Sequence, residues 1–339
     1  MAGPELASSR SIHEAGSVGL TLITGASGFV GSHLMREMRQ RGLPARGVSR
    51  QNRPDLVAIP SYSATTNWPT YLSGIDVIVH LAARVHVMRE TAADPLSAFR
   101  EANVDATLSL ARQAAKAGVK RFVFVSTIKV NGEQTEPTKP FTSEDPINPQ
   151  DPYAISKAEA EAALLALGQD TGMEIVILRP ALIYGPGVGG NFRRLMHWAV
   201  RGYPSIFADV KNIRSLLYVG NLCDLIITTL THADAANKIF LACDDQAFST
   251  HELLLNLAAA SGQDIRSIPI PPPVLRTLGR LAFQEDAMGR LLNNLEIDAT
   301  ATGKHLSWRC PFDSFTGLST SIRPIRPPET SLPSASHQS

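Results

Sequence analysis

The stretch T-G-A-S-G-F-V-G, residues 24–31, constrains the fold of this 339-residue chain more than any other part of it. It follows a short apolar run at 19–24, typical of a buried strand, and leads into a helical pattern at 32–42. Its three glycines let the backbone turn tightly and approach a pyrophosphate, which the free N–H groups of a helix N-terminus bind. Between a first strand and a first helix, this loop predicts a dinucleotide-binding unit rather than a tight turn without a ligand.

Apolar strands alternate with helical patterns through the first half of the chain. Strands that are apolar throughout are typical of a parallel sheet covered by helices on both faces. We therefore predict an α/β fold with a doubly wound parallel sheet of the Rossmann type. The expected strands are 19–24, 44–50, 76–83, 121–127 and 174–180, and the expected helices are 32–42, 94–117 and 152–167.

The pattern changes beyond Tyr184, where glycine and proline become frequent and the alternation becomes irregular. We expect some of this second half to return to the sheet. The tail is rich in proline and serine, which favours disorder. The predicted parts are a flexible leader at 1–17, a dinucleotide-binding domain at 18–185, a smaller, mainly substrate-binding region at 186–323 and a disordered tail at 324–339.

Composition argues against several classes of protein. The formal net charge of +1 implies no large basic surface for nucleic acid or an anionic membrane. No apolar run approaches the length of a membrane span. The cysteines Cys223, Cys243 and Cys310 are far apart, which fits neither a disulfide framework nor a metal site, and no other metal-ligand spacing is present. We expect a reducing, cytoplasmic compartment.

The end of the second expected strand bears on the choice of cofactor. NAD-binding units of this type carry an acidic residue there, which holds the ribose 2′-OH. Here the strand runs into G-V-S-R-Q-N-R, with Arg50 at the expected acidic position and Arg53 close by. A guanidinium binds a 2′-phosphate that a carboxylate would repel. The sequence thus favours NADP(H), with NAD(H) as the alternative if Arg50 is only a solvated loop residue.

The motif Y-A-I-S-K places Tyr153 four residues before Lys157, at the start of the helical pattern 152–167. Residues at i and i+4 share one helix face, so the two side chains are neighbours. The spacing alone leaves two interpretations open, an ordinary helix tyrosine and a catalytic acid.

Six segments together resemble the NAD-dependent epimerase/dehydratase family of extended short-chain dehydrogenases/reductases. They occur in the order that is typical of that family, and the resemblance covers roughly residues 19–320. Members of this family act on nucleotide sugars. The segments are T-G-A-S-G-F-V-G, D-V-I-V-H-L-A-A, V-S-T-I-K-V-N-G, Y-A-I-S-K, L-R-P-A-L-I-Y-G-P-G and R-S-L-L-Y-V-G-N.

The resemblance implies that Thr127, Tyr153 and Lys157 are catalytic. Tyr153 would exchange a proton with a substrate oxygen, Thr127 would orient that oxygen, and Lys157 would hold the nicotinamide ribose. We expect the Lys157 cation, with an oxidised nicotinamide nearby, to favour the phenolate and lower the pKa of Tyr153 toward neutrality. The expected cofactor contacts are Gly25, Ser27, Gly28, Phe29, Val30, Gly31, Arg50, Leu81, Ala82, Ala83, Tyr153, Lys157 and Pro180.

On the substrate side, the resemblance implies that Arg214 and Asn191 contact a nucleotide diphosphate, and that His86 lines a sugar pocket. A structural role is the alternative for two of them, since Asn191 is also suited to cap a helix and a lone histidine is often structural. The family pattern has an aromatic residue at Asn131 and acidic residues at Ser215 and Asn221.

Three functions compete at this stage. The first is reduction of a UDP-4-keto-6-deoxy-N-acetylhexosamine at C4 with NAD(P)H, which would make UDP-N-acetylquinovosamine or UDP-N-acetylfucosamine for surface polysaccharide such as O-antigen. The alternative is a UDP-hexose 4-epimerase with bound NAD, and the remote alternative is a non-catalytic nucleotide sensor. Because Ile128 and Lys129 replace an Asp-Glu pair, a dehydratase is disfavoured. The resemblance also implies a homodimer formed through helices 94–117 and 152–167.

Overall fold

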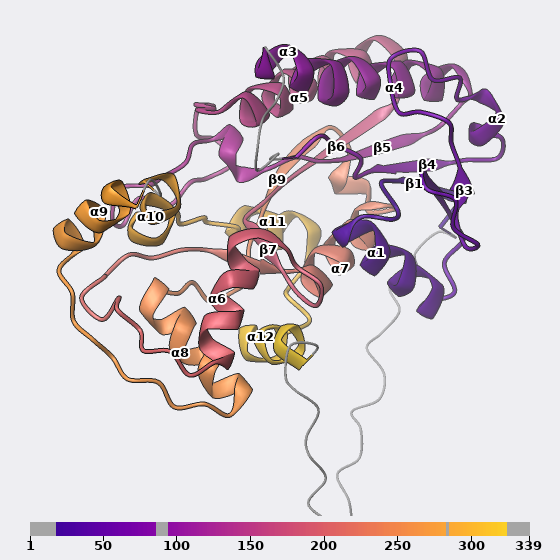
Figure 1. Ribbon diagram of the computed structural model, residues 1–339. Coiled ribbons are helices and arrows are strands. Elements are labelled where there is room, and N and C mark those ends of the chain that lie inside the picture. The colour runs from indigo at the N-terminus through magenta and orange to yellow at the C-terminus, as the bar shows by residue number, and fades with distance from the viewer. Residues whose placement is uncertain (1–17, 86–93, 283–284, 324–339) are drawn as a thin grey trace, which may run out of the picture.

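The computed structural model describes residues 18–85, 94–282 and 285–323, and all statements of absence or number below refer to them. Within these ranges seven parallel strands form one sheet in the order β3-β2-β1-β4-β5-β6-β9 (Figure 1). This confirms the predicted doubly wound α/β fold. The strands are β1 (Thr21–Thr24), β2 (Ala45–Ser49), β3 (Val57–Ala58), β4 (Val77–His80), β5 (Arg121–Val125), β6 (Glu174–Pro180) and β9 (Lys238–Ala242).

Helices cover both faces of this sheet. In Figure 1, α3 (Pro95–Arg100), α4 (Ala106–Lys116) and α5 (Pro152–Thr171) lie above it, and α1 (Phe29–Gln40) and α7 (Val219–Thr229) lie below it. Neighbouring residues of one strand point to opposite faces. Accordingly, Phe122 and Phe124 of β5 join one buried cluster with α4 and α5, while Val123 joins the other with α1 and α7.

The remaining elements lie mostly in the second half of the chain. A second, two-stranded sheet pairs β7 (Leu182–Tyr184) with β8 (Leu216–Tyr218). Strand β9 leaves this half to complete the large sheet beside β6. The other helices are α2 (Pro69–Leu72), α6 (Gly190–Val200), α8 (Thr250–Ser261), α9 (Pro272–Leu281), α10 (Glu285–Leu292), α11 (Thr300–Leu306) and α12 (Ser314–Ile322), with short 3-10 turns at Ile128–Val130 and Ala233–Ala235.

The helix expected at 94–117 is not one regular helix. A π-helical turn, Glu101–Asp105, separates α3 from α4. The extra residue of such a turn rotates the side chains that follow it, and π-turns are frequent at functional sites. Helix α5, in contrast, is regular and longer than expected, and it ends at Gly172, whose φ of 76° suits a glycine C-cap.

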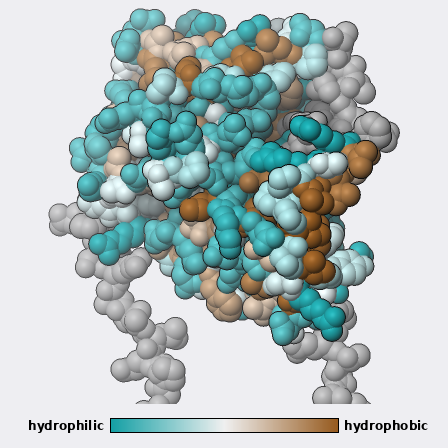
Figure 2. Space-filling view, turned by 90° about the vertical axis from the view of Figure 1, so that its left-hand side faces the viewer, coloured by the Kyte–Doolittle hydropathy of each residue, from teal (hydrophilic) through white to brown (hydrophobic). Residues whose placement is uncertain are grey.

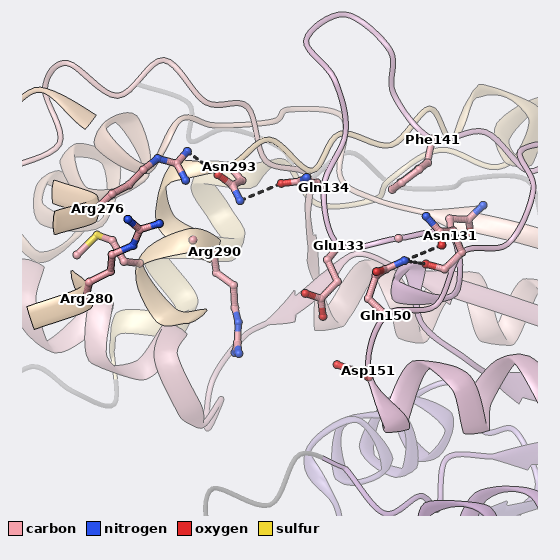
Figure 3. A pocket seen from close by; sticks show the side chains of 14 residues that line it. Asn131, Glu133, Gln134, Phe141, Gln150, Asp151, Arg276, Arg280, Arg290 and Asn293 are labelled. Carbon is pink, nitrogen blue, oxygen red and sulfur yellow. Dashed lines mark hydrogen bonds between the residues drawn. The ribbon is translucent and has the colours of Figure 1, made fainter. Parts of the chain in front are cut away.

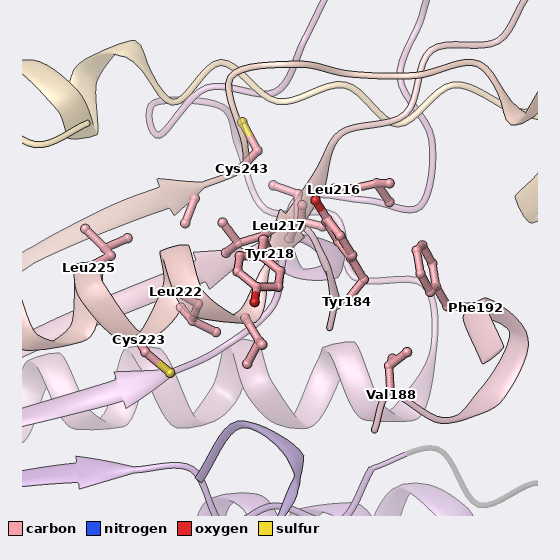
Figure 4. Close-up of a cluster of buried hydrophobic side chains, with 14 of the residues drawn as sticks. Tyr184, Val188, Phe192, Leu216, Leu217, Tyr218, Leu222, Cys223, Leu225 and Cys243 are labelled. Atoms are coloured by element: carbon pink, nitrogen blue, oxygen red, sulfur yellow. The ribbon is translucent and has the colours of Figure 1, made fainter. Parts of the chain in front are cut away.

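Two departures from the family pattern have a structural explanation. Tyr184 and Tyr218 belong to a buried hydrophobic cluster (Figure 4). The buried carboxylate of Asp244 accepts hydrogen bonds from the Tyr184 hydroxyl (2.9 Å) and from Asn221 Nδ2 (2.8 Å). Asn221 Nδ2 also donates a hydrogen bond to the Phe312 carbonyl, and Asn221 Oδ1 accepts one from the Phe312 N–H. A carboxamide that donates and accepts satisfies this buried site, where a second carboxylate would repel Asp244.

Asn131, which replaces the family's aromatic residue, belongs to another buried network. Its Oδ1 accepts a hydrogen bond from Arg179 Nη1 at 3.0 Å, and Arg179 forms an ion pair with Glu161 (Nη2–Oε2 2.6 Å). Both charged side chains are 4% exposed. Asn131 thus satisfies a guanidinium N–H that an aromatic ring would leave without an acceptor.

Candidate active site

The glycine loop and the segment after β4 meet at the carboxyl edge of the sheet. Gly25 has a φ of +66°, and a Cβ there would lie 2.8 Å from the Ala82 nitrogen. A Cβ on Gly31 would overlap the Gly25 carbonyl oxygen. The Thr24 hydroxyl accepts hydrogen bonds from the backbone N–H groups of Leu81 and Ala82, both at 3.3 Å. Close backbone packing therefore requires these glycines and leaves the N-terminus of α1 open.

His80 holds this arrangement from beneath. Its Nδ1 is 2.8 Å from the Thr24 hydroxyl and its Nε2 is 2.8 Å from the Tyr62 hydroxyl. Complete burial, and then the charge of Lys157, lower the pKa of His80 well below its usual value. Thr24 already accepts two N–H groups, so its own proton fits a bond to a neutral Nδ1. His80 was not among the predicted site residues, because a lone histidine in an apolar strand carries no specific signal.

At the end of β2, the structure places Ser49 rather than Arg50 against the glycine loop. The Ser49 hydroxyl donates a hydrogen bond to Ser27 Oγ at 3.0 Å, whereas Arg50, the next residue, is exposed. Ser49 therefore occupies the strand-end position that an acidic residue takes in the NAD-binding pattern. The described end of β2 thus presents the hydroxyl of Ser49 in place of a carboxylate, and Arg50 is the next residue.

These residues fit a nicotinamide dinucleotide. Gly25 packs so closely against Ala82, and Gly31 against Gly25, that neither position admits a side chain, and the resulting compact loop lets its backbone approach a pyrophosphate. Farther along the sheet edge, the buried hydroxyl of Ser126 has no hydrogen-bond partner among the described residues, so it is free to bind a polar group of a ligand. Pro180, the last residue of β6, ends at the same edge.

Thr127 follows the end of β5, and Lys157 contacts the last residue of that strand. The Thr127 hydroxyl accepts the Lys129 N–H at 3.3 Å, which leaves the Thr127 proton for a substrate oxygen. Lys157 Nζ donates to the Val125 carbonyl at 2.7 Å and lies 3.8 Å from the centre of the Phe124 ring. Burial lowers the pKa of Lys157 to about 7, although the charge of Glu161 opposes that shift.

Tyr153 lies one helical turn before Lys157, with its ring edge-on to Phe99 of α3 at 6.1 Å. Burial, and then the charge of Asp151, raise the pKa of Tyr153, because both disfavour the phenolate. The expected lowering involves an oxidised nicotinamide beside Lys157 and stays a prediction. The raised pKa keeps the Tyr153 phenol protonated, so that it can donate a proton.

Asn103, in the π-helical turn, was not predicted. Its Nδ2 donates to Ser156 Oγ at 2.9 Å, and Ser156 Oγ donates to the Tyr153 carbonyl at 2.8 Å. Asn103 Oδ1 also accepts the backbone N–H of Arg84 at 2.8 Å. It thereby ties the first turn of α5 to the segment after β4. The only sequence signal was an asparagine within a helical pattern, where asparagine is a weak helix former.

A cavity of ≈ 730 Å³ opens between the loops after β5 and the helices α9 and α10 (Figure 3). Arginines from α9 and α10 lie on one side of it, and Glu133, Gln150 and Asp151 lie on the other. Asn293 joins the two sides, as it accepts from Arg276 (2.9 Å) and donates to Gln134 (3.0 Å). Figure 2 shows this side of the molecule, which is largely hydrophilic with hydrophobic patches. The arginines are Arg276, Arg280 and Arg290.

The predicted substrate residues fare differently. Arg214 does not line the cavity itself, but its Nη1 donates a hydrogen bond to the carbonyl of the lining residue Asn293 at 2.9 Å. Burial, then repulsion from Arg290, lowers the pKa of Arg214 to about 10, against the attraction of Glu133. Asn191 is an exposed residue in the first turn of α6, whose N-cap is Gly189, so it neither caps that helix nor lines the cavity. His86 falls outside the described residues.

The described residues include neither a membrane-spanning helix nor a metal-binding cluster. No helix there has both the length and the apolar character needed to cross a bilayer. No three acidic, histidine or cysteine side chains converge there in a way that would hold a metal ion.

Comparison with known proteins identifies the relatives of this chain. It is 40% identical over 296 residues to a UDP-glucose 4-epimerase of Vibrio cholerae, covering 86% of this chain and 90% of that protein. It is 27% identical to a GDP-6-deoxy-D-mannose reductase of Pseudomonas aeruginosa, covering 75% of this chain and 84% of the relative.

The fold is similar to the crystal structure of a UDP-glucose 4-epimerase of Thermus thermophilus in complex with NAD. The TM-score is 0.71 at 22% identity, over 90% of this chain and 98% of that one. The model of the NAD dependent epimerase/dehydratase family matches residues 21–243. These matches agree with the glycine loop and with the presence of Thr127, Tyr153 and Lys157. The chain belongs to the NAD-dependent epimerase/dehydratase family of extended short-chain dehydrogenases/reductases.

Proposed function

We propose that the protein is a UDP-hexose 4-epimerase, which oxidises C4 of a nucleotide-linked sugar and reduces it again from the other face. The observation that carries this proposal is the 40% identity to a UDP-glucose 4-epimerase over nearly the whole chain, in a protein that retains Thr127, Tyr153 and Lys157. The cofactor is NAD(P), which accepts a hydride and returns it. The 4-ketoreductase that the sequence favoured becomes the second candidate.

The chain's own residues supply the proton chemistry. In the oxidising half, the Tyr153 phenolate takes the proton of the C4 hydroxyl group, and in the reducing half the phenol so formed returns a proton to the C4 oxygen. Thr127 donates a hydrogen bond to the same oxygen and fixes its orientation. Lys157 would bind a ribose hydroxyl, and protonation of Lys157 favours the phenolate form of Tyr153 when the tyrosine must act as a base.

We propose that the cavity lined by Asp151, two residues before Tyr153, takes the nucleotide diphosphate. Arg276 of α9 and Arg290 of α10 line it, and Arg214 donates a hydrogen bond to the carbonyl of Asn293, which also lines it. Guanidinium groups suit a diphosphate in charge and in geometry. The region 186–323 would thus supply the substrate contacts, as expected, although the arginines of α9 and α10 were not predicted.

One observation favours the second candidate. The strand-end position of β2 is Ser49 with Arg50 beside it, and a carboxylate that would repel a 2′-phosphate is missing there. A reductase exchanges its cofactor at every turnover, and NADPH would suit this edge. The substrate would then be a UDP-4-keto-6-deoxy-N-acetylhexosamine.

Cofactor content and turnover distinguish the two candidates. The purified protein is denatured, released nucleotide is quantified, and the native protein is offered UDP-glucose, UDP-galactose and their N-acetylated forms without added cofactor. An epimerase carries about one NAD(H) per chain and interconverts a pair of these sugars. Protein that is empty, binds NADPH in preference to NADH and converts none of them contradicts the proposal and favours the reductase.

A further inference from the structure

The side chain of Lys129 joins the turn after β5 to Asp151, the N-cap of α5, and these two segments carry the proposed catalytic hydroxyl groups. Its Nζ lies 2.6 Å from Asp151 Oδ2 and 2.7 Å from Glu133 Oε1. The Lys129 and Asp151 side chains are 27% and 23% exposed, so solvent screens this pair less than a surface pair. Lys129 is two residues after Thr127, and Asp151 is two residues before Tyr153.

Hydrogen bonds continue from this ion pair in both directions. On one side, the backbone N–H of Lys129 donates to the Thr127 hydroxyl at 3.3 Å. On the other side, Asp151 is the N-cap of α5 and its Oδ1 accepts the N–H of Ala154 at 2.6 Å. Each Asp151 oxygen therefore has its own role, one holding the helix and the other holding Lys129.

We propose that Lys129 is a positioning residue, which fixes the first turn of α5 relative to the Thr127 turn and so sets the distance between the Thr127 and Tyr153 hydroxyl groups. This inference rests on the proposed C4 chemistry, in which both groups contact one substrate oxygen. The Lys129 side chain acts on the first turn of α5 through Asp151, and the Lys129 backbone N–H contacts the Thr127 hydroxyl.

Charge gives Lys129 a second effect on the same site. The Asp151 carboxylate contributes to the raised pKa of Tyr153. Lys129 is the cation that offsets this carboxylate and the neighbouring Glu133. Without Lys129, two carboxylates at the cavity rim would repel each other, and the N-cap of α5 would lose its support.

The chain provides a matched control. Lys139 pairs with Glu136 at the surface, where the two side chains are 73% and 71% exposed and neither residue lines the cavity. Exposed pairs of this kind contribute little. Lys139→Met therefore removes the same charge and the same kind of ion pair, but it leaves the contacts of the Thr127 turn and of the first turn of α5 unchanged.

The test compares Lys129→Met, Lys129→Arg and Lys139→Met with the unmodified protein. We expect Lys129→Met to lower kcat roughly 10- to 100-fold, as a misplacement of reacting groups does, with KM changed by less than about 2-fold. Amide hydrogen exchange in the first turn of α5 should become faster. Lys129→Arg should restore most of kcat, and Lys139→Met should behave as the unmodified protein in every measurement.

Unchanged exchange in the first turn of α5, or unchanged kcat, in Lys129→Met overturns the proposal. Equal losses of kcat and thermal stability in both Lys129 variants would indicate a general folding role and overturn it as well. Hydrogen exchange does not depend on turnover. If the unmodified protein converts no nucleotide sugar, the proposed function fails, and the effect of Lys129 on α5 is still decided by exchange.

Discussion

Replacing Glu161 by glutamine would test the buried ion pair behind the active site. Glu161 on α5 forms three hydrogen bonds with Arg179 on β6, and both side chains are 4% exposed. The replacement leaves the Arg179 charge buried, with only the neutral amides of Asn131 and the new glutamine near it. Removing one partner of a buried ion pair costs about 3–5 kcal/mol.

The neighbouring Glu159 is the matched control. It lies half a turn away on α5 and pairs with Arg100, but these side chains are 36% and 48% exposed. For Glu159→Gln we expect a loss of about 0–1 kcal/mol, the usual contribution of a surface pair. The two variants thus remove the same charge from the same helix, and only the burial of the remaining arginine differs.

Urea unfolding, followed by circular dichroism, measures both effects. With a slope of about 3 kcal/mol per molar urea, a loss of 3–5 kcal/mol lowers the midpoint by roughly 1–1.7 M. The double variant Glu161→Leu with Arg179→Met removes both charges and should recover much of the loss. If Glu161→Gln shifts the midpoint no more than Glu159→Gln does, the assigned cost of the buried Arg179 charge is wrong.

Three further predictions concern the active site itself. Gly31→Ala should abolish binding of NADH or NADPH in a fluorescence titration, because its Cβ would overlap the Gly25 carbonyl, while Gly189→Ala, where the Cβ meets open space, should bind as the unmodified protein does; equal binding by both variants would contradict the tight packing of the loop. Tyr153→Phe should lower kcat about 10²- to 10⁴-fold at an unchanged midpoint of urea unfolding, and a turnover rate near that of the unmodified protein would exclude Tyr153 as the acid. The depressed pKa of Lys157 means that the unfolded chain binds more protons than the folded one between pH 7 and 10.5, so the cofactor-free protein should gain stability as pH rises through this range. Lys157→Met should flatten that slope, and an equal slope in both proteins would show that Lys157 keeps an ordinary pKa.

Local patterns in the sequence were enough to predict the frame of the site. Residues 19–24 and 121–127 are apolar in runs that only a doubly covered sheet accommodates, and both segments form central strands, β1 and β5. The glycine loop and the Y-A-I-S-K motif are equally local, since each depends on the spacing of residues within one turn or one helix. The family followed from these motifs together with the other matching segments.

Contacts between distant residues decided the rest. Ser49 meets Ser27, Asn103 meets Ser156, and Lys129 meets Asp151 across 22 residues or more, and no periodicity in the sequence records such pairs. The pKa of Tyr153 likewise depends on burial and on the charge of Asp151, which only the packed structure sets. The sequence by itself determined the sheet and the glycine loop and predicted the catalytic residues. Tertiary structure decided the burial and the hydrogen-bond partners of these side chains, because desolvation and long-range hydrogen bonds exist only once the chain has folded.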